Sequence, residues 1–267
     1  MTATAISPTT TTRLQTIFED LRAALLRVIT EHRVTWEEYS AASRFLAEAG
    51  RRDFEIPMLI DVFLSQAVDD LTHAHEGTEC NVEGPFYVAG APGLEPPYRL
   101  PRRPDEPGTR LVVSGTVRSI DGSPLAGATL DVWQANGAGE YSHFHPGVPE
   151  HNLRGQLTAD GEGRFEFETV IPAAYEIPND GATGRLLAAL GRHCFRPGHI
   201  HLKLSHENAA PLTTQIYFDG DPWLDSDVAG AMKQSLVTTL ARREGDDGAP
   251  YATCSYDFVL PAARSMR

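Results

Sequence analysis

The chain has 267 residues, of which 41% are hydrophobic, and its formal net charge is −13 with a sequence pI near 5.2. This hydrophobic content is enough for a buried core that needs no added cross-links. The acidic balance argues against a nucleic-acid partner, because phosphate binding requires a surplus of Lys and Arg. No apolar run approaches the roughly 20 residues of a membrane-spanning helix.

Three cysteines occur, Cys80, Cys194 and Cys254, and no two of them form a C-x-x-C pair. The sequence therefore predicts neither a disulfide framework nor a thiolate zinc site, and it indicates a reducing compartment. The first dozen residues are polar and rich in Thr, without the basic and apolar segments of a secretory signal. We expect a cytoplasmic protein whose residues 1–11 form a disordered tail.

Three segments of the N-terminal third have the apolar spacing of amphipathic helices. The first covers residues 12–32. The second covers residues 36–49, begins at a capping box formed by Thr35 and Glu38, and ends before Gly50. The third covers residues 57–71. We assign residues 12–83 to a helical domain.

Composition changes between Pro85 and Pro107, where seven of the nineteen prolines exclude helix and central strand. Short alternating runs separated by turn residues follow, the pattern of an antiparallel β-sandwich or barrel. The runs cover residues 110–120, 128–134, 156–158, 164–169, 199–205, 212–218 and 256–260, with a helix expected near 227–240. The predicted fold class is α+β, with a helical region followed by an antiparallel β-sandwich domain over residues 84–267.

Two histidines stand two residues apart in one predicted strand. Strand alternation places His199 and His201 on one face, and Ile200, Leu202 and Leu204 on the other. Such a pair can bind a metal ion, but a hydrogen-bonded or solvent-facing pair has the same pattern. Without thiolates, the remaining ligands of a metal would be carboxylates or tyrosinates.

Two tyrosines lie in loops rich in Gly, Pro and Ala: Tyr141, in residues 136–144, and Tyr175, in residues 172–178. From composition alone, a loop tyrosine is usually a packing residue with its hydroxyl at the surface. His143, His145 and His151 lie close in sequence to Tyr141 and could form a different metal set.

An ordered set of motifs runs through nearly the whole chain. The motifs occupy residues 77–79, 83–87, 130–136, 139–142, 172–175, 191–193, 196–197 with 199–201, and 213–216. Together they resemble the intradiol ring-cleavage dioxygenases, which comprise the catechol, chlorocatechol and hydroxyquinol 1,2-dioxygenases. Two departures are Gln134, where many members have His, and Gly198, where Ala is usual.

The resemblance implies one ferric ion per subunit, with no flavin, haem or nicotinamide. Its ligands would be Tyr141, Tyr175, His199 and His201, with Tyr175 and His201 axial, and His143, His145 and His151 outside the ligand set. Two tyrosinates stabilise iron(III) over iron(II). Three catalytic residues are implied: Tyr175 as base, Arg196 as a fixed positive charge, and Gln215 as a hydrogen-bond donor near bound oxygen. A surface ion pair for Arg196 and an ordinary strand amide for Gln215 are the alternatives.

The implied reaction cleaves a catechol-type ring between its two hydroxylated carbons with O2, giving a cis,cis-muconate in aromatic-compound catabolism. Catechol or a chlorocatechol is the expected substrate, and hydroxyquinol, giving maleylacetate, is the alternative. A zinc or iron(II) site with a carboxylate, and a non-catalytic binding module, are the competing classes. The predicted substrate-binding residues are Met58, Asp61, Val82, Gly84, Phe86, Tyr87 and Ala229.

Asp61 could accept a hydrogen bond from a third ring hydroxyl, or it could cap a local backbone donor. The resemblance also implies a homodimer formed through the N-terminal helices, with an apolar tunnel that can enclose a phospholipid.

Overall fold

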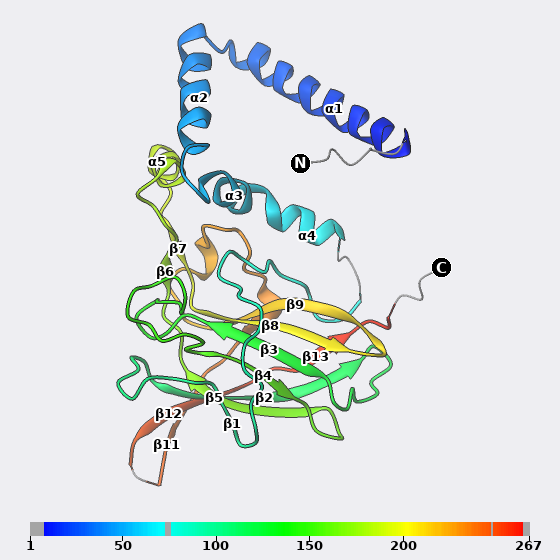
Figure 1. The fold of residues 1–267 in the computed structure, drawn as a ribbon, viewed down its shortest axis with the longest axis vertical. Coiled ribbons are helices and arrows are strands. Elements are labelled where there is room, and N and C mark those ends of the chain that lie inside the picture. Colours follow the sequence, from blue (N-terminus) through cyan, green and yellow to red (C-terminus); the bar gives the residue numbers. More distant parts are fainter. Residues whose placement is uncertain (1–7, 73–75, 247, 264–267) are drawn as a thin grey trace. The chain divides into compact units, whose positions relative to one another are not determined.

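The computed structural model describes residues 8–72, 76–246 and 248–263. The chain forms two units, residues 1–53 and residues 54–267, which we describe separately (Figure 1). Residues 1–7 of the predicted tail lie outside the described residues. Among the described helices, none has both the length and the apolar character needed to cross a membrane.

The first unit contains α1 (Pro8–His32) and α2 (Trp36–Ala49). The first helix starts at Pro8, earlier than predicted, because proline suits the first helical position, where its missing N–H is not required. The bounds predicted for the second helix are confirmed. Its capping box is formed as expected: the Glu38 amide donates to Thr35 Oγ1 at 3.2 Å, and the Thr35 amide donates to Glu38 Oε2 at 2.8 Å.

The second unit begins with one helical run of three parts, α3 (Glu55–Ile60), the π-helical turn η1 (Asp61–Ser65) and α4 (Gln66–Thr72). The predicted helix is confirmed, but its π-helical turn was not foreseen. Buried Glu55 fixes this run to α5 (Ala182–Ala189), because Glu55 Oε2 accepts hydrogen bonds at 2.9 Å from both the amide and the hydroxyl of Thr183.

Two packed sheets and a small two-stranded sheet form most of the rest of the unit. The first sheet has the order β1 (Tyr98–Arg99), β5 (Arg164–Val170), β2 (Arg110–Ser119), β12 (Pro250–Ser255) and β11 (Ala241–Glu244), with β13 (Phe258–Leu260) also paired to β2. The second has the order β10 (Val237–Thr238), β9 (Ala209–Phe218), β8 (His199–His206), β3 (Thr129–Gln134) and β4 (Arg154–Thr158). The third pairs β6 (Tyr175–Glu176) with β7 (Phe195–Arg196).

The predicted order of helices first and a β-sandwich second is confirmed, but the sheets are mixed rather than purely antiparallel. Strands β12 and β13 run parallel to β2, β1 runs parallel to β5, and β10 runs parallel to β9. These pairs are joined by long excursions of the chain instead of tight hairpins, so the connection does not impose antiparallel pairing.

The helix predicted near residues 227–240 was wrong. This segment contains the short 3-10 turn η3 (Gln234–Leu236) followed by β10, and a second 3-10 turn, η2 (Leu224–Ser226), precedes it. Gly230 has a left-handed φ of 60°, and the Asp227 carboxylate accepts the amides of Ala229 and Ala231. These local bonds replace helical ones, so the apolar spacing did not determine the structure.

Buried side chains form two clusters. The larger lies between the two sheets and includes Leu111, Val113 and Phe167 from one, and Ile200, Leu202 and Leu204 from the other. The smaller includes Phe86, Trp133, Tyr141 and Tyr175. The sandwich core therefore supports a second, aromatic cluster that contains both predicted tyrosine ligands.

Candidate functional site

His199 and His201 begin strand β8 and are both 1% exposed. Their strand neighbours Ile200 and Leu202 point into the sandwich core, which confirms the predicted alternation of faces. The Nε2 atoms of the two histidines lie 2.9 Å apart. The fold therefore brings two imidazole nitrogens to one point.

Both imidazoles are held in the neutral form. Burial, followed by the nearby Arg196 charge, lowers the pKa of His199 to about 3. The pKa of His201 is also lowered, by burial first and then by His199 and Arg196. The Pro197 carbonyl lies 2.7 Å from His199 Nδ1, so the proton is on Nδ1 and the Nε2 lone pair is turned toward Arg196 Nη1 and His201 Nε2. A neutral imidazole is the form that binds metals.

Tyr141 lies in the loop after β3 and is completely buried. Its ring stacks on Phe86 at 4.6 Å, and its amide donates to His145 Nδ1 at 2.9 Å. Its hydroxyl has no hydrogen-bond partner among the described residues. Burial raises the pKa of Tyr141 well above its usual value, and the Arg196 and Arg154 charges oppose that rise.

Tyr175 reaches the same place through a different element. Pairing of β6 with β7 sets Tyr175 opposite Arg196. The Tyr175 ring centroid lies 5.4 Å from that of Tyr141 and 5.7 Å from that of His199. Burial raises the pKa of Tyr175, and Arg196 opposes the rise. Two phenols and two imidazoles thus converge from a loop, a short strand and β8.

These residues fit a bound transition-metal cation. The set supplies two nitrogen and two oxygen donors, a combination suited to several first-row transition metals. The Tyr141 hydroxyl is buried and has no hydrogen-bond partner among the described residues, so other protein groups there do not satisfy this oxygen. A cation would also overcome the burial that keeps both phenols protonated, because a nearby positive charge favours tyrosinate.

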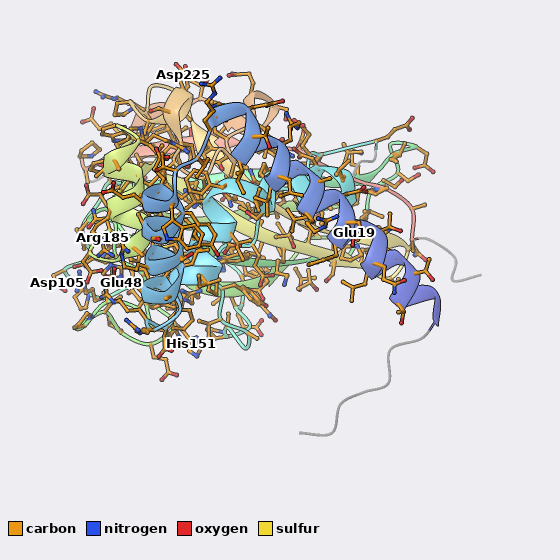
Figure 2. All side chains as sticks on the ribbon, turned by 90° about the horizontal axis from the view of Figure 1, so that it is seen from above. Glu19, Glu48, Asp105, His151, Arg185 and Asp225 are labelled. Atoms are coloured by element: carbon orange, nitrogen blue, oxygen red, sulfur yellow. The ribbon has the colours of Figure 1, made fainter. Side chains whose placement is uncertain are left out.

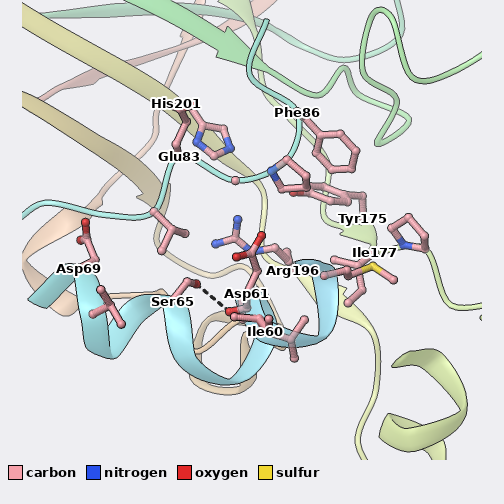
Figure 3. A pocket seen from close by; sticks show the side chains of 18 residues that line it. Ile60, Asp61, Ser65, Asp69, Glu83, Phe86, Tyr175, Ile177, Arg196 and His201 are labelled. Atoms are coloured by element: carbon pink, nitrogen blue, oxygen red, sulfur yellow. Dashed lines mark hydrogen bonds between the residues drawn. The ribbon is translucent and has the colours of Figure 1, made fainter. Parts of the chain in front are cut away.

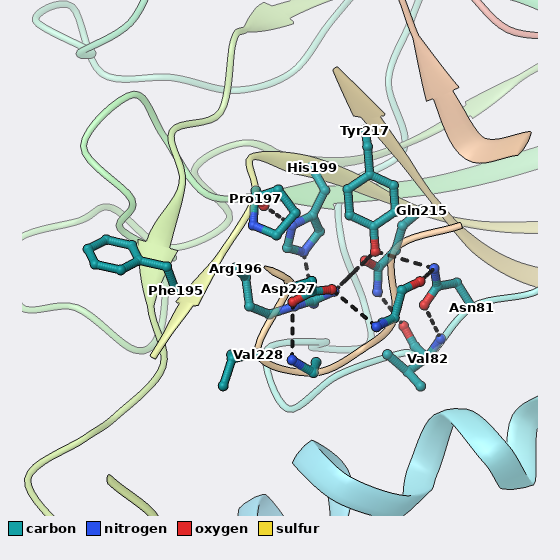
Figure 4. Close-up of polar contacts among 12 residues, drawn as sticks. Asn81, Val82, Phe195, Arg196, Pro197, His199, Gln215, Tyr217, Asp227 and Val228 are labelled. Atoms are coloured by element: carbon teal, nitrogen blue, oxygen red, sulfur yellow. Dashed lines mark hydrogen bonds and ion pairs between the residues drawn. The ribbon is translucent and has the colours of Figure 1, made fainter. Parts of the chain in front are cut away.

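Arg196 is buried at the centre of a polar network (Figure 4). Its guanidinium donates to both carboxylate oxygens of Asp227 at 3.1 Å and to Gln215 Oε1 at 3.0 Å, and its Nη1 lies 3.2 Å from His199 Nε2. The Asp227 charge holds the guanidinium ionised against its burial. This arrangement is not the surface ion pair that was the alternative for Arg196.

Gln215 lies on β9 and is fully buried. Its Nε2 donates to the Val82 carbonyl at 2.7 Å, and its Oε1 accepts from Arg196 and, at 2.6 Å, from the Tyr217 hydroxyl. Gln215 does not line the adjoining cavity. In this structure it orients Arg196.

A cavity of about 650 Å³ opens beside these groups, and all its lining residues belong to the second unit (Figure 3). Tyr175, Arg196 and His201 form its polar end, and the helical run from α3 to α4 forms the facing wall. Six of the seven predicted substrate-binding residues line it: Met58, Asp61, Val82, Gly84, Phe86 and Ala229. Most of its surface is aliphatic or aromatic, which suits a flat ring.

Tyr87, the seventh predicted residue, does not line this cavity. Its hydroxyl donates to Asp131 at 3.1 Å, and its ring lies against Trp133 at 4.8 Å and beneath the Lys203 ammonium. Trp133 in turn stacks on His201 with centroids 4.6 Å apart and planes 8° from parallel. The structure therefore connects Tyr87 to the site through Trp133.

Asp61 projects its carboxylate into the cavity (Figure 3). No hydrogen bond or ion pair to this carboxylate occurs within the described part of the chain, and burial alone raises its pKa. Its own backbone carbonyl accepts the Ser65 hydroxyl at 2.7 Å. The carboxylate is therefore available to a ligand and does not cap a backbone donor.

Three supporting residues were not assigned roles from the sequence: Trp133, Arg154 and Asp227. Trp133 and Asp227 lie in segments that were noticed, but nothing in the sequence indicated which side chains they would contact. Arg154 is 1% exposed and donates to the Ser142 hydroxyl at 2.5 Å, next to Tyr141. A basic residue on an alternating strand usually faces solvent, so its burial could not be inferred.

Comparison with known proteins gives two family matches that together span most of the chain. Residues 11–79 match the family described as catechol dioxygenase N terminus, and residues 82–262 match the family described as dioxygenase. The chain belongs to the intradiol dioxygenase family.

Individual members of the family cover nearly the full length of the chain. The chlorocatechol 1,2-dioxygenase of Rhodococcus opacus is 37% identical over 253 residues, which are 93% of this chain and 98% of that protein. The hydroxyquinol 1,2-dioxygenase of a Rhizobium strain is 35% identical, over 93% of this chain and 89% of that protein. The crystal structure of 3-chlorocatechol 1,2-dioxygenase from Rhodococcus opacus 1CP superposes with a TM-score of 0.90 at 39% identity, covering 95% of this chain and all of the other.

Proposed function

We propose that this protein is a ferric intradiol dioxygenase that cleaves catechol or a chlorinated catechol between its two hydroxylated carbons. The reaction consumes O2 and yields a cis,cis-muconate. The observation that carries this proposal is the convergence of two neutral, buried imidazoles and two buried phenols beside an apolar cavity. Membership of the intradiol family supports the same chemistry.

Tyr141, Tyr175, His199 and His201 would hold one ferric ion per subunit. When bound, the ion would supply Lewis acidity toward the diol and draw electron density from its ring. Tyr175 and His201 line the cavity, whereas Tyr141 and His199 do not. We therefore assign proton acceptance from a diol hydroxyl to Tyr175 Oη, since it is the phenol that a substrate can reach.

Arg196 contributes a fixed positive charge at the polar end of the cavity. It is held there by Asp227 and Gln215, so it needs no rearrangement when negative charge develops on the substrate. Gln215 acts as a positioning residue for Arg196. The apolar walls, including Met58, Val82 and Phe86, exclude water and receive the ring.

Hydroxyquinol, giving maleylacetate, is the second candidate substrate, and a specific observation favours it. The Asp61 carboxylate faces the cavity without a partner in the described part of the chain, and it could accept a hydrogen bond from a third ring hydroxyl. A relative of the chain is a hydroxyquinol 1,2-dioxygenase.

Oxygen uptake and product analysis test the proposal directly. Iron-loaded protein is offered catechol, chlorocatechols, methylcatechols and hydroxyquinol under isotopically labelled O2. We expect ring-opened dicarboxylates that carry both labelled oxygen atoms. The proposal would be contradicted by products of cleavage next to the two hydroxylated carbons instead of between them. It would also be contradicted if fully iron-loaded protein consumed no oxygen.

We also propose that the protein is a homodimer paired through its N-terminal helices, which can enclose a phospholipid. The exposed apolar side chains of α1, among them Leu14, Phe18 and Leu21, support this proposal. We retain 12–83 and 84–267 as functional domains, and the two family matches, which end at 79 and begin at 82, support that boundary. The free cysteines suit a reducing compartment such as the cytoplasm.

A further inference from the structure

The three histidines that follow Tyr141 have different surroundings. His145 is engaged with Tyr141, whose amide donates to its Nδ1. His143 and His151 instead face each other, with ring centroids 5.3 Å apart and planes inclined by 69°. His145 therefore supports the candidate iron centre through Tyr141, whereas His143 and His151 form a separate pair.

Glu150 completes a group with that pair. Its Oε1 lies 3.9 Å from His151 Nε2, and one ligand atom from each of His143, Glu150 and His151 lies within 4.8 Å of the other two. His143 and Glu150 are exposed and His151 is partly exposed. In Figure 2 His151 lies at the outer edge of the side chains. An ion from solvent can reach this group.

The protein itself does not use the group fully. His151 Nδ1 is buried and has no hydrogen-bond partner among the described residues. His143 and His151 both have left-handed backbones, with φ of 67° and 59°. Such conformations are uncommon for residues other than glycine, but histidine adopts them more readily than most. The grouping of two imidazoles and one carboxylate, with a ring nitrogen of His151 unpaired in the described part of the chain, indicates a ligand site.

We propose that His143, Glu150 and His151 bind a divalent transition-metal ion of the zinc class, separate from the candidate iron centre. Two imidazoles and one carboxylate suit such ions, with water completing the coordination. Zinc lies about 2.0–2.2 Å from nitrogen and oxygen ligands, so the group must contract slightly. Rotation of the exposed Glu150 side chain can supply that contraction.

The ion would cross-link both ends of the loop that starts at Tyr141 and leads into β4. The far end of this loop is already tied to the near end, because Arg154 donates to the Ser142 hydroxyl and carbonyl. A bound ion adds a second tie between residues 143 and 151. Its role is therefore to stabilise the loop that carries Tyr141.

Zinc titration of the iron-loaded protein by calorimetry tests the proposal. We expect one saturable Zn²⁺ site per chain, with the iron content unchanged by elemental analysis. His143→Asn and His151→Asn remove an imidazole while keeping a residue that tolerates a left-handed backbone. Each should weaken binding by at least about tenfold, the scale on which even outer-shell partners matter. His206→Asn, elsewhere on the sandwich, should leave binding unchanged.

Absence of a saturable site, or equal binding by the wild type and both variants, would overturn the proposal. A second measurement uses the wild-type protein, so its result does not depend on whether the variants fold. Chemical modification of histidines, mapped by mass spectrometry with and without Zn²⁺, should show protection confined to His143 and His151. The site would also be refuted if saturating Zn²⁺ left the modification rates of His143 and His151 the same as without Zn²⁺.

Discussion

The four candidate ligands differ in what made them predictable. His199 and His201 follow from strand alternation, because a two-residue spacing places both side chains on one face. Tyr141 and Tyr175 could be proposed only through family resemblance, since no periodicity operates in the loops that hold them. The structure brings all four together, and their roles as metal ligands remain proposals.

Asp61 is expected to govern which ring substituent is accepted. In Asp61→Asn, the kcat/KM for hydroxyquinol should fall about tenfold relative to that for catechol, because the acceptor of the hydrogen bond loses its charge and the bond becomes weaker. Steady-state kinetics with both substrates measures the ratio. Leu64→Ala, on the same π-helical turn but outside the cavity lining, serves as the control. An unchanged ratio in Asp61→Asn would remove this residue from the specificity argument.

Asp227 is expected to be important for stability because it neutralises buried Arg196. Their side chains are 2% and 5% exposed, so Asp227→Asn leaves a buried charge without its partner. We expect a loss of about 3–5 kcal/mol in the free energy of unfolding, measured by urea denaturation. Glu19→Gln, which breaks an exposed ion pair with Arg22, should change stability little. Equal effects of the two substitutions would contradict this account of Arg196.

At the scale of elements, the site depends on close contact between the start of β8 and the segment before β6. A Cβ atom on Gly198 would lie 2.4 Å from the Pro172 carbonyl oxygen, and the Gly198 amide donates to Asp221 at 2.8 Å. The hydrogen bond to Asp221 fixes the Gly198 backbone against Pro172. This contact holds the Tyr175 segment beside the two histidines.

Gly198→Ala is therefore expected to destabilise the protein by about 1–3 kcal/mol, the usual cost of overpacking. It should also weaken iron binding, because the displaced segment carries Tyr175. Thermal unfolding and iron titration provide the two measurements. Gly161→Ala is the control, since a Cβ there meets no atom within 4 Å. Wild-type behaviour of both variants would show that the contact relaxes without cost.

Whether an element could be predicted depends on whether local or long-range interactions determine it. The capping box of α2 and the alternation in β8 are local, and both were predicted correctly. The π-helical turn at Asp61 was not, because no sequence rule separates it from ordinary helix. The segment after Asp227 was predicted wrongly as helix, since the bonds that shape it involve a carboxylate paired with distant Arg196. Long-range contacts explain these failures.

At the scale of the whole molecule, the first unit leaves an unusual amount of apolar surface uncovered. Leu14, Ile17, Phe18, Leu21 and Leu25 of α1 are each at least half exposed. They lie on one face of the helix by their spacing. A contiguous apolar stripe of this length is typical of an interaction surface.

Sedimentation analysis is expected to give twice the chain mass of 29.2 kDa. Leu21→Lys combined with Leu25→Lys should shift the protein toward monomer, because two charges would be buried in the proposed interface. Arg27→Gln alters the opposite face of α1 and should leave the dimer intact. If the wild-type protein were a monomer, the proposed dimer would be excluded. If the two lysines left the dimer intact, the interface would not include this face of α1.

The visible absorption spectrum of the purified, iron-loaded protein tests the proposed metal centre most directly. Charge transfer from tyrosinate to iron(III) should colour the protein red to burgundy, and chemical reduction should bleach it. Tyr141→Phe should lose most of this absorption, whereas Tyr39→Phe, which alters an exposed tyrosine of α2, should keep it. A colourless protein with full iron content, or an unchanged spectrum in Tyr141→Phe, would contradict the two-tyrosine, two-histidine site.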